Sequence, residues 1–183
     1  MIIGLGNPGK KYENTYHNMG YKTVTALADK LGLVIDKKEC EALTASKYIG
    51  GRRVVLALPT TYMNLSGEAV ALLMGRYKAE KDDVVIVYDD IDIPSGTVRA
   101  RKSGSAGSHN GMRDIVSRIG TEFKRIRIGV GRPPESIPLI DFVLMNELPS
   151  HKEGLATARE RAADALVKYL TDGDFDKLMR ELN

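Results

Sequence analysis

The chain has 183 residues, of which 43% are hydrophobic and 28% charged, and its formal net charge is +3. These values are typical of one globular domain, which we assign to residues 1–183. Because Cys40 is the single cysteine, the chain has no internal disulfide framework. No apolar run approaches the roughly 20 residues that a membrane span needs. We therefore expect a cytoplasmic protein without a membrane association.

Apolar patterns in the first half of the chain predict three strands and two helices. Gly32 follows one helical pattern as an expected stop, and Ser66 precedes the other as an expected N-terminal cap. Gly50 and Gly51 separate two apolar runs, which is typical of a β-hairpin. The predicted elements are strands at 2–5, 42–49 and 54–58 and helices at 21–31 and 69–77.

The second half continues the alternation and ends in helices. The predicted elements are strands at 84–88, 97–101 and 123–130, helices at 115–119, 155–169 and 174–182, and a glycine-serine loop at 103–108. Alternating strands and helices indicate an α/β fold. We predict a single-domain mixed, mostly parallel twisted sheet with helices on both faces.

The segment 133–150 interrupts this pattern. Pro138, Asn146 and Pro149 disfavour a continuous helix around the apolar stretch 140–144. A mobile lid over a binding site is one interpretation of this segment. A plain connection with a short helix is the other, and the sequence does not separate the two.

Positive charge is concentrated between Thr97 and Arg132. This stretch has nine basic and two acidic residues, a net charge of +7, which leaves −4 for the rest of the chain. Glycines and polar residues are interleaved with the bases. The pattern favours a surface that binds a polyanion over a surface that is basic by chance.

Near the N-terminus, a short strand runs into Gly4-Leu5-Gly6-Asn7-Pro8-Gly9, and His17 follows within one loop. The glycine spacing matches the dinucleotide-binding fingerprint, but that fingerprint requires a helix to open at its third glycine. Lys10-Lys11-Tyr12-Glu13-Asn14 has no helical periodicity. We therefore expect a stiff loop that presents Asn7 and His17 to a cleft.

His17 is a candidate general base, because neutral imidazole accepts a proton near pH 7. Asp89 ends the apolar run at 84–88, so it is expected at the same sheet edge and could orient His17. Clustered Asp89, Asp90 and Asp92 also permit a magnesium site, but no phosphate-binding loop accompanies them. We favour a histidine–aspartate pair without a metal. With no Gly-x-Ser-x-Gly motif present, water is the expected nucleophile.

Three asparagines lie beside glycine-rich or strand-end segments: Asn7, Asn64 and Asn110. An amide offers both a donor and an acceptor, which suits recognition of peptide groups and stabilisation of an oxyanion. Asn110 is also expected where a helix begins, a position that favours a nearby negative group.

Taken together, five motifs closely resemble the bacterial-type peptidyl-tRNA hydrolase family over almost the whole chain. They are Gly4-Leu5-Gly6-Asn7-Pro8-Gly9, Tyr12…Thr15-x-His17-Asn18-x-Gly20, Pro59-x-x-Tyr62-Met63-Asn64-x-Ser66-Gly67, Asp89-Asp90-Ile91-Asp92-x-Pro94-x-Gly96 and Gly104-Ser105-Ala106-Gly107-Ser108-His109-Asn110-Gly111. The resemblance implies a hydrolase that cleaves the ester between a peptide and the 3′ end of tRNA. It further implies a monomer that needs no cofactor, no metal and no obligate protein partner.

By the same resemblance, His17 is the general base, Asp89 orients and stabilises it, and Asn7 separates N-blocked from free aminoacyl-tRNA. The other matching positions are substrate contacts (Tyr12, Tyr62, Asn64, Asn110), a cleft wall (Met63), a helper near the tRNA end (His109) and basic positions (Arg101, Arg127).

The chain departs from the family pattern at two positions. Tyr16 stands where the family often has arginine, which puts one phosphate contact in doubt, and Ser108 stands where it often has glycine. The alternative function is that of a non-catalytic RNA-binding accessory protein with the same fold. The intact His17, Asp89 and asparagine set speaks against that alternative.

Overall fold

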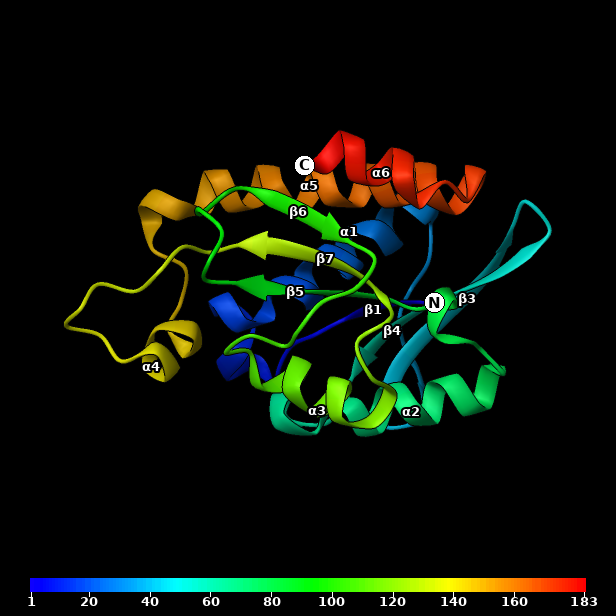
Figure 1. The fold of residues 1–183 in the computed structure, drawn as a ribbon, viewed down its shortest axis with the longest axis horizontal. Helices are drawn as coiled ribbons and strands as arrows, with labels where there is room; N and C mark the ends of the chain where they lie inside the picture. Colours follow the sequence, from blue (N-terminus) through cyan, green and yellow to red (C-terminus); the bar gives the residue numbers. More distant parts are fainter.

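A seven-stranded mixed sheet forms the centre of the molecule, and helices cover both of its faces (Figure 1). The computed structural model describes residues 1–183. The strands are β1 (Ile2–Gly4), β2 (Lys37–Glu39), β3 (Ala42–Ile49), β4 (Arg52–Pro59), β5 (Val85–Asp90), β6 (Val98–Arg101) and β7 (Lys124–Gly129). Their order in the sheet is β2-β3-β4-β1-β5-β7-β6.

The centre of the sheet is parallel and its margins are antiparallel. Strands β4, β1, β5 and β7 run parallel to one another. The β3–β4 hairpin, β2 and the edge strand β6 add antiparallel pairs. The predicted α/β fold with a mixed sheet is confirmed, and its parallel character is confined to the centre.

The chain forms six α-helices: α1 (Met19–Leu31), α2 (Ser66–Tyr77), α3 (Asn110–Ile119), α4 (Leu139–Leu144), α5 (Pro149–Asp172) and α6 (Phe175–Leu182). Helices α1, α5 and α6 lie on one face, and α2 and α3 lie on the other (Figure 1). Four short 3-10 turns complete the chain: η1 (Lys10–Tyr12), η2 (Tyr16–Asn18), η3 (Met63–Leu65) and η4 (Lys81–Asp83). No helix combines the length and hydropathy of a membrane span.

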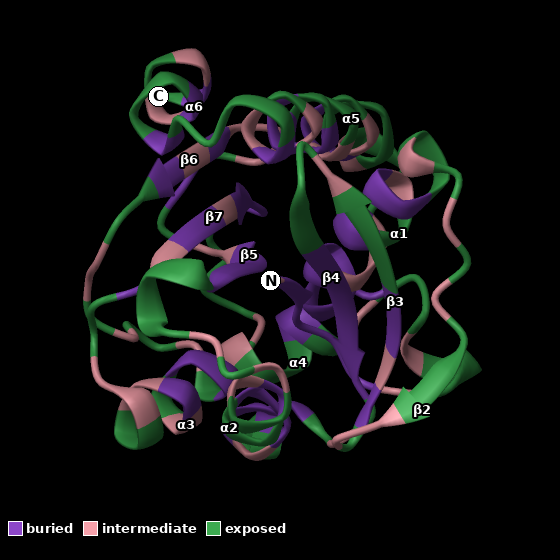
Figure 2. Cartoon of the chain, turned by 90° about the vertical axis from the view of Figure 1, so that its right-hand side faces the viewer, coloured by how far each residue is buried: buried purple, intermediate pink, exposed green.

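Alternate residues of the central strands supply two separate cores. Ile2 and Val87 pack in the core beneath α1 and α5, whereas Ile3 and Ile86 pack in the core beneath α2 and α3. This division follows from the two-residue period of a strand, which sends successive side chains to opposite faces. Figure 2 shows the central strands β5 and β7 buried between helices with exposed outer sides, whereas β2 at the edge of the sheet is exposed.

The structure corrects three local predictions. Ser66 is the first residue of α2 rather than its cap, and its hydroxyl donates to the carbonyl of Met63. Helix α5 begins at Pro149, earlier than the predicted helix at 155–169, because the first helical turn does not need the N–H that proline lacks. Strand β2 was not predicted, because Lys37-Lys38-Glu39 has no apolar pattern.

Two glycines bring the N-terminus of α1 against the parallel strands. A Cβ on Gly20 would lie 2.2 Å from the carbonyl oxygen of Val87, and one on Gly4 would lie 2.3 Å from that of Gly20. Only glycine permits this approach of helix to strand. Since η2 directly precedes α1, the close contact carries His17 to the end of β5, where Asp89 lies.

The segment after Gly9 is the 3-10 turn η1, and the first α-helix begins only at Met19. A dinucleotide-binding fingerprint would require a helix opening at Gly9. The glycine motif therefore forms a loop and not the start of a helix, as predicted.

Candidate active site

A cavity of about 740 Å³ opens at the carboxyl ends of β1 and β5. All eleven site residues predicted from the sequence line it: Asn7, Tyr12, His17, Tyr62, Met63, Asn64, Asp89, Arg101, His109, Asn110 and Arg127. They come from five separate stretches of the chain. The carboxyl ends of the parallel strands lie at one edge of the sheet, which brings the loops that follow them together.

Asp89 lies between two histidines at the bottom of the cavity. Nδ1 of His17 is 3.0 Å from both carboxylate oxygens of Asp89, and Nε2 of His109 is 3.1 Å from one of them. The Asp89 side chain is only 2% exposed, and the two histidines are 9% and 8% exposed. This geometry fixes both imidazole rings against one carboxylate.

The hydrogen bonds determine which nitrogen of each histidine carries the proton. Nδ1 of His109 accepts from the backbone N–H of Met112 at the start of α3, so its proton is on Nε2 and is donated to Asp89. His17 donates from Nδ1 to the same carboxylate. Its Nε2 therefore keeps a free lone pair, the requirement for a general base.

Burial and neighbouring charges shift the pKa values of Asp89, His109 and His17 in different directions. Burial alone would raise the pKa of Asp89, but the two histidines hold it well below its usual range. Burial lowers the pKa of His109 despite the nearby carboxylate. Burial also lowers the pKa of His17, yet the charge of Asp89 and the hydrogen bond to it raise that pKa above its ordinary value of 6.5. Among the two histidines, His17 is therefore the one whose protonated form is favoured by its surroundings, whereas His109 is held in its neutral form.

The ligand atoms of His17, Asp89 and His109 lie within 4.8 Å of one another, a spacing that a metal ion could use. Ligation through Nε2 of His109 would require the proton to move to Nδ1. That nitrogen already accepts the N–H of Met112. The donor set thus fits a hydrogen-bonded network better than a metal centre.

Asn7 is held so that its amide nitrogen faces the cavity. Its Oδ1 accepts from the backbone N–H of Met63, and Asn18 brackets its backbone by bonding both its N–H and its carbonyl. Nδ2 of Asn7 has no hydrogen-bond partner within the chain. The side chain, which is 6% exposed, therefore offers one fixed donor to a ligand.

We call Asn7, His17, Asp89 and His109 the floor of the site. The mouth consists of residues with larger exposure and fewer internal partners: Tyr12, Tyr62, Asn64, Arg101, Asn110 and Arg113. Tyr12 and Tyr62 meet edge to face, with 6.5 Å between ring centroids, and Tyr62 is 58% exposed. Their ring surfaces are available for stacking.

Basic side chains cover the cavity wall beside β6 and β7. Arg101 is exposed and forms no ion pair, whereas Nε of Arg127 contacts Asp90 at 2.8 Å. Arg125 is 1% exposed and donates to the carbonyls of Ser105 and Thr121, which anchors the glycine-serine loop. Arg125 therefore supports the wall, and Arg101 is the free cation on it.

The whole chain, residues 1–183, matches the family described as peptidyl-tRNA hydrolase. The chain belongs to this family. Relatives named peptidyl-tRNA hydrolase include one from Exiguobacterium sp., 46% identical over 187 residues, which cover 100% of this chain and 98% of the relative. Another, from Shouchella clausii, is 43% identical over 184 residues, covering 100% and 99%.

Solved structures of the family agree with this assignment. The crystal structure of peptidyl-tRNA hydrolase from Acinetobacter baumannii aligns with a TM-score of 0.94 at 36% identity. The alignment covers 100% of this chain and 93% of that one. The family resemblance inferred from the five motifs is confirmed.

Sequence reasoning missed several residues that shape the site. Asn18, Tyr88 and Arg125 act through buried hydrogen bonds or ring contacts, which no local pattern signals. Helix α4 supplies an apolar wall through Leu139, Ile140, Val143 and Leu144. Its apolar stretch was visible in the sequence as part of the candidate lid, and the lid interpretation stays a prediction.

Proposed function

We propose that the chain hydrolyses peptidyl-tRNA by activating a water molecule with His17. The observation that carries this proposal is a buried His17–Asp89 pair at the bottom of a cavity that also holds Asn7 and a free arginine. Family membership supports the substrate: a peptide, or an N-blocked aminoacyl group, joined by an ester to the 3′ end of tRNA.

In this mechanism, Nε2 of His17 accepts a proton from water, and the hydroxide attacks the ester carbonyl. Asp89 keeps the Nδ1 proton in place and stabilises the imidazolium that forms, the role of the orienting acid in a hydrolase triad. The imidazolium then returns its proton to the departing 3′ oxygen. The products are free tRNA and a peptide with a carboxylate end.

An asparagine amide or a backbone N–H stabilises the oxyanion. Asn64 and Asn110 lie on the cavity lining with exposed amides. Asn110 also begins α3, where the helix dipole favours negative charge.

Asn7 accounts for the preference for blocked substrates. Its Nδ2 is a donor without an internal partner, and an N-acyl group supplies a carbonyl acceptor that this donor can bind. A free aminoacyl group carries an α-ammonium, which has only donors. Facing donors repel one another, so the free form is disfavoured.

The mouth supports the nucleic-acid end of the substrate. Arg101 binds backbone phosphates without reading sequence, and Arg127 on the adjoining wall adds positive charge for the same phosphates beside its ion pair with Asp90. Tyr12 and Tyr62 stack on an unpaired terminal base or ribose. A substrate made during translation implies action in the cytoplasm. We further infer that the monomer is the active form, because all the proposed groups come from one chain.

Hydrolysis of N-acetyl-aminoacyl-tRNA, measured beside its free aminoacyl counterpart with EDTA present, tests this function. The expected result is release of tRNA from the blocked substrate only. Equal release from both substrates would contradict the role of Asn7. Salt-sensitive tRNA binding without hydrolysis would instead favour the non-catalytic RNA-binding alternative.

A further inference from the structure

Tyr16 directly precedes the proposed base His17 and is completely buried. It stands at the position where the sequence motif of the family often has arginine. A fully buried ring cannot reach a phosphate. Tyr16 therefore does not make the phosphate contact that an arginine at this position could make. The proposed mechanism assigns no role to its hydroxyl.

The hydroxyl of Tyr16 joins two groups that follow helix α4 in the chain. It accepts from the backbone N–H of Leu148 at 3.1 Å and lies 2.8 Å from Nδ1 of His151. The hydroxyl therefore accepts from Leu148, and it donates its own proton to His151 when that ring carries its proton on Nε2. Both partners lie at the start of α5, where the chain leaves the cavity wall.

The ring and backbone of Tyr16 contact α4 itself. The ring stacks on Phe142, with centroids 4.7 Å apart and planes at 23°. The backbone N–H of Tyr16 donates to the carbonyl of Met145, the residue that directly follows α4. Among the elements of the fold, η2 is the one that α4 packs against most. Tyr16 thus supplies a ring contact and a backbone hydrogen bond to α4, while its neighbours Asn14 and Thr15 hold the residues that follow the helix.

The opposite side of α4 faces the cavity. Ile140 and Leu144 line it, and they are 60% and 37% exposed, unlike the buried Phe142 beneath them. An exposed apolar wall beside the reacting centre suits apolar side chains of a bound peptide.

We propose that Tyr16 is a positioning residue that fixes α4 as the apolar wall for the peptide part of the substrate. The effect on catalysis rests on the proposed hydrolase function. His17 is held separately by two contacts to Asp89, so the base does not depend on the Tyr16 hydroxyl. Tyr16 therefore governs KM for substrates with an apolar side chain and leaves kcat nearly unchanged.

The test is Tyr16→Phe, which keeps the ring stacked on Phe142 but leaves the N–H of Leu148 without its acceptor. We expect KM for N-acetyl-phenylalanyl-tRNA to rise about three- to tenfold, in keeping with the loss of one buried hydrogen bond. For N-acetyl-glycyl-tRNA, we expect KM to change by less than about twofold, because glycine has no side chain that could contact the wall. Hydrogen exchange should accelerate at residues 139–148 of the free protein.

Tyr77→Phe is the matched control. The Tyr77 hydroxyl bonds Glu39 outside the active-site cavity, so its loss should leave both KM values unchanged. His151→Leu removes the acceptor of the Tyr16 hydroxyl at a partly exposed site and should raise KM in the same direction. His151→Gln, which retains an acceptor, should keep the KM for N-acetyl-phenylalanyl-tRNA close to the wild-type value.

The exchange measurement does not depend on activity, so it separates this proposal from the proposed function. Unchanged exchange at residues 139–148 in Tyr16→Phe would overturn the positioning role even if hydrolysis is confirmed. Equal rises in KM for the phenylalanyl and glycyl substrates would overturn it as well. Such a result would indicate a general loss of structure, because the α4 wall can affect only the substrate whose side chain contacts it.

Discussion

The floor and the mouth of the site differ in how their polar groups are satisfied. On the floor, Asp89 is 2% exposed and bonds two histidines, and Asn7 is braced by Asn18 and Met63. At the mouth, Arg101 is exposed and forms no ion pair. Buried, mutually bonded groups hold a fixed geometry, whereas exposed groups without partners remain available to a ligand.

The difference assigns separate tasks to the two regions. Changes on the floor should reduce the rate of the chemical step with little effect on tRNA binding. Changes at the mouth should weaken binding in a salt-dependent way and leave the chemical step intact.

The largest expected effect is that of His17→Ala on the floor. Removing the base should lower kcat by about 10²–10⁴-fold, the usual contribution of general base catalysis. Binding of N-acetyl-aminoacyl-tRNA should stay close to wild type, because His17 contacts Asp89 rather than the mouth. Steady-state kinetics together with a filter-binding assay measures both quantities, and near-normal turnover would refute the assignment of the base.

Asp89→Asn should lower kcat and shift its pH dependence. His17 must be deprotonated to act, so activity falls as the pH drops through its pKa, which Asp89 raises. Without that charge, burial dominates and the pKa of His17 falls, so the acid limb of the pH–rate profile should move to lower pH. A profile with an unmoved acid limb would argue against the His17–Asp89 pair.

The smallest expected effect is at the mouth. Arg101→Gln should weaken tRNA binding about three- to tenfold and lower the salt dependence of log Kd by about one unit, as expected for one lost phosphate contact. The slope of affinity against salt concentration measures this directly.

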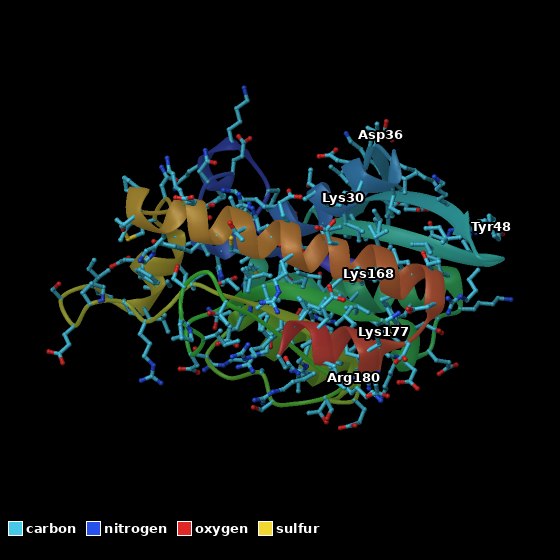
Figure 3. The ribbon with its side chains drawn as sticks, turned by 90° about the horizontal axis from the view of Figure 1, so that it is seen from above. Lys30, Asp36, Tyr48, Lys168, Lys177 and Arg180 are labelled. Atoms are coloured by element: carbon cyan, nitrogen blue, oxygen red, sulfur yellow. The ribbon has the colours of Figure 1, made fainter.

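Lys177→Gln on α6 is the control for Arg101→Gln. Lys177 lies on the helix surface away from the cavity, beside Arg180 and Lys168 (Figure 3), and it pairs with Asp172 at 3.0 Å. Its replacement should leave both affinity and salt slope unchanged. An equal effect of the two substitutions would show that net charge, rather than the mouth, controls binding.

Much of the floor could be anticipated from the sequence. His17 and Asp89 are 72 residues apart, but His17 lies in the loop that follows β1 and Asp89 lies at the carboxyl end of β5, and the ends of parallel strands meet at one edge of the sheet. The third member of the group, His109, was named from its motif. Its bond to Asp89 depends on the path of the glycine-serine loop, which no periodicity specifies.

The parts that escaped prediction depend on contacts between distant segments. The role of Asn18 in bracing Asn7 requires the closed geometry of the loop between β1 and α1. The fixing of α4 by Tyr16 joins residues more than a hundred positions apart. Strand β2 forms by pairing with β3 rather than by its own propensity.

Single-turnover hydrolysis of N-acetyl-aminoacyl-tRNA, compared between His17→Ala and Arg101→Gln at rising enzyme concentration, tests the division between floor and mouth most directly. The account predicts that Arg101→Gln reaches the wild-type rate at saturation, while His17→Ala stays slow at every concentration. A saturating rate that remains low in Arg101→Gln, or that recovers in His17→Ala, would contradict the account.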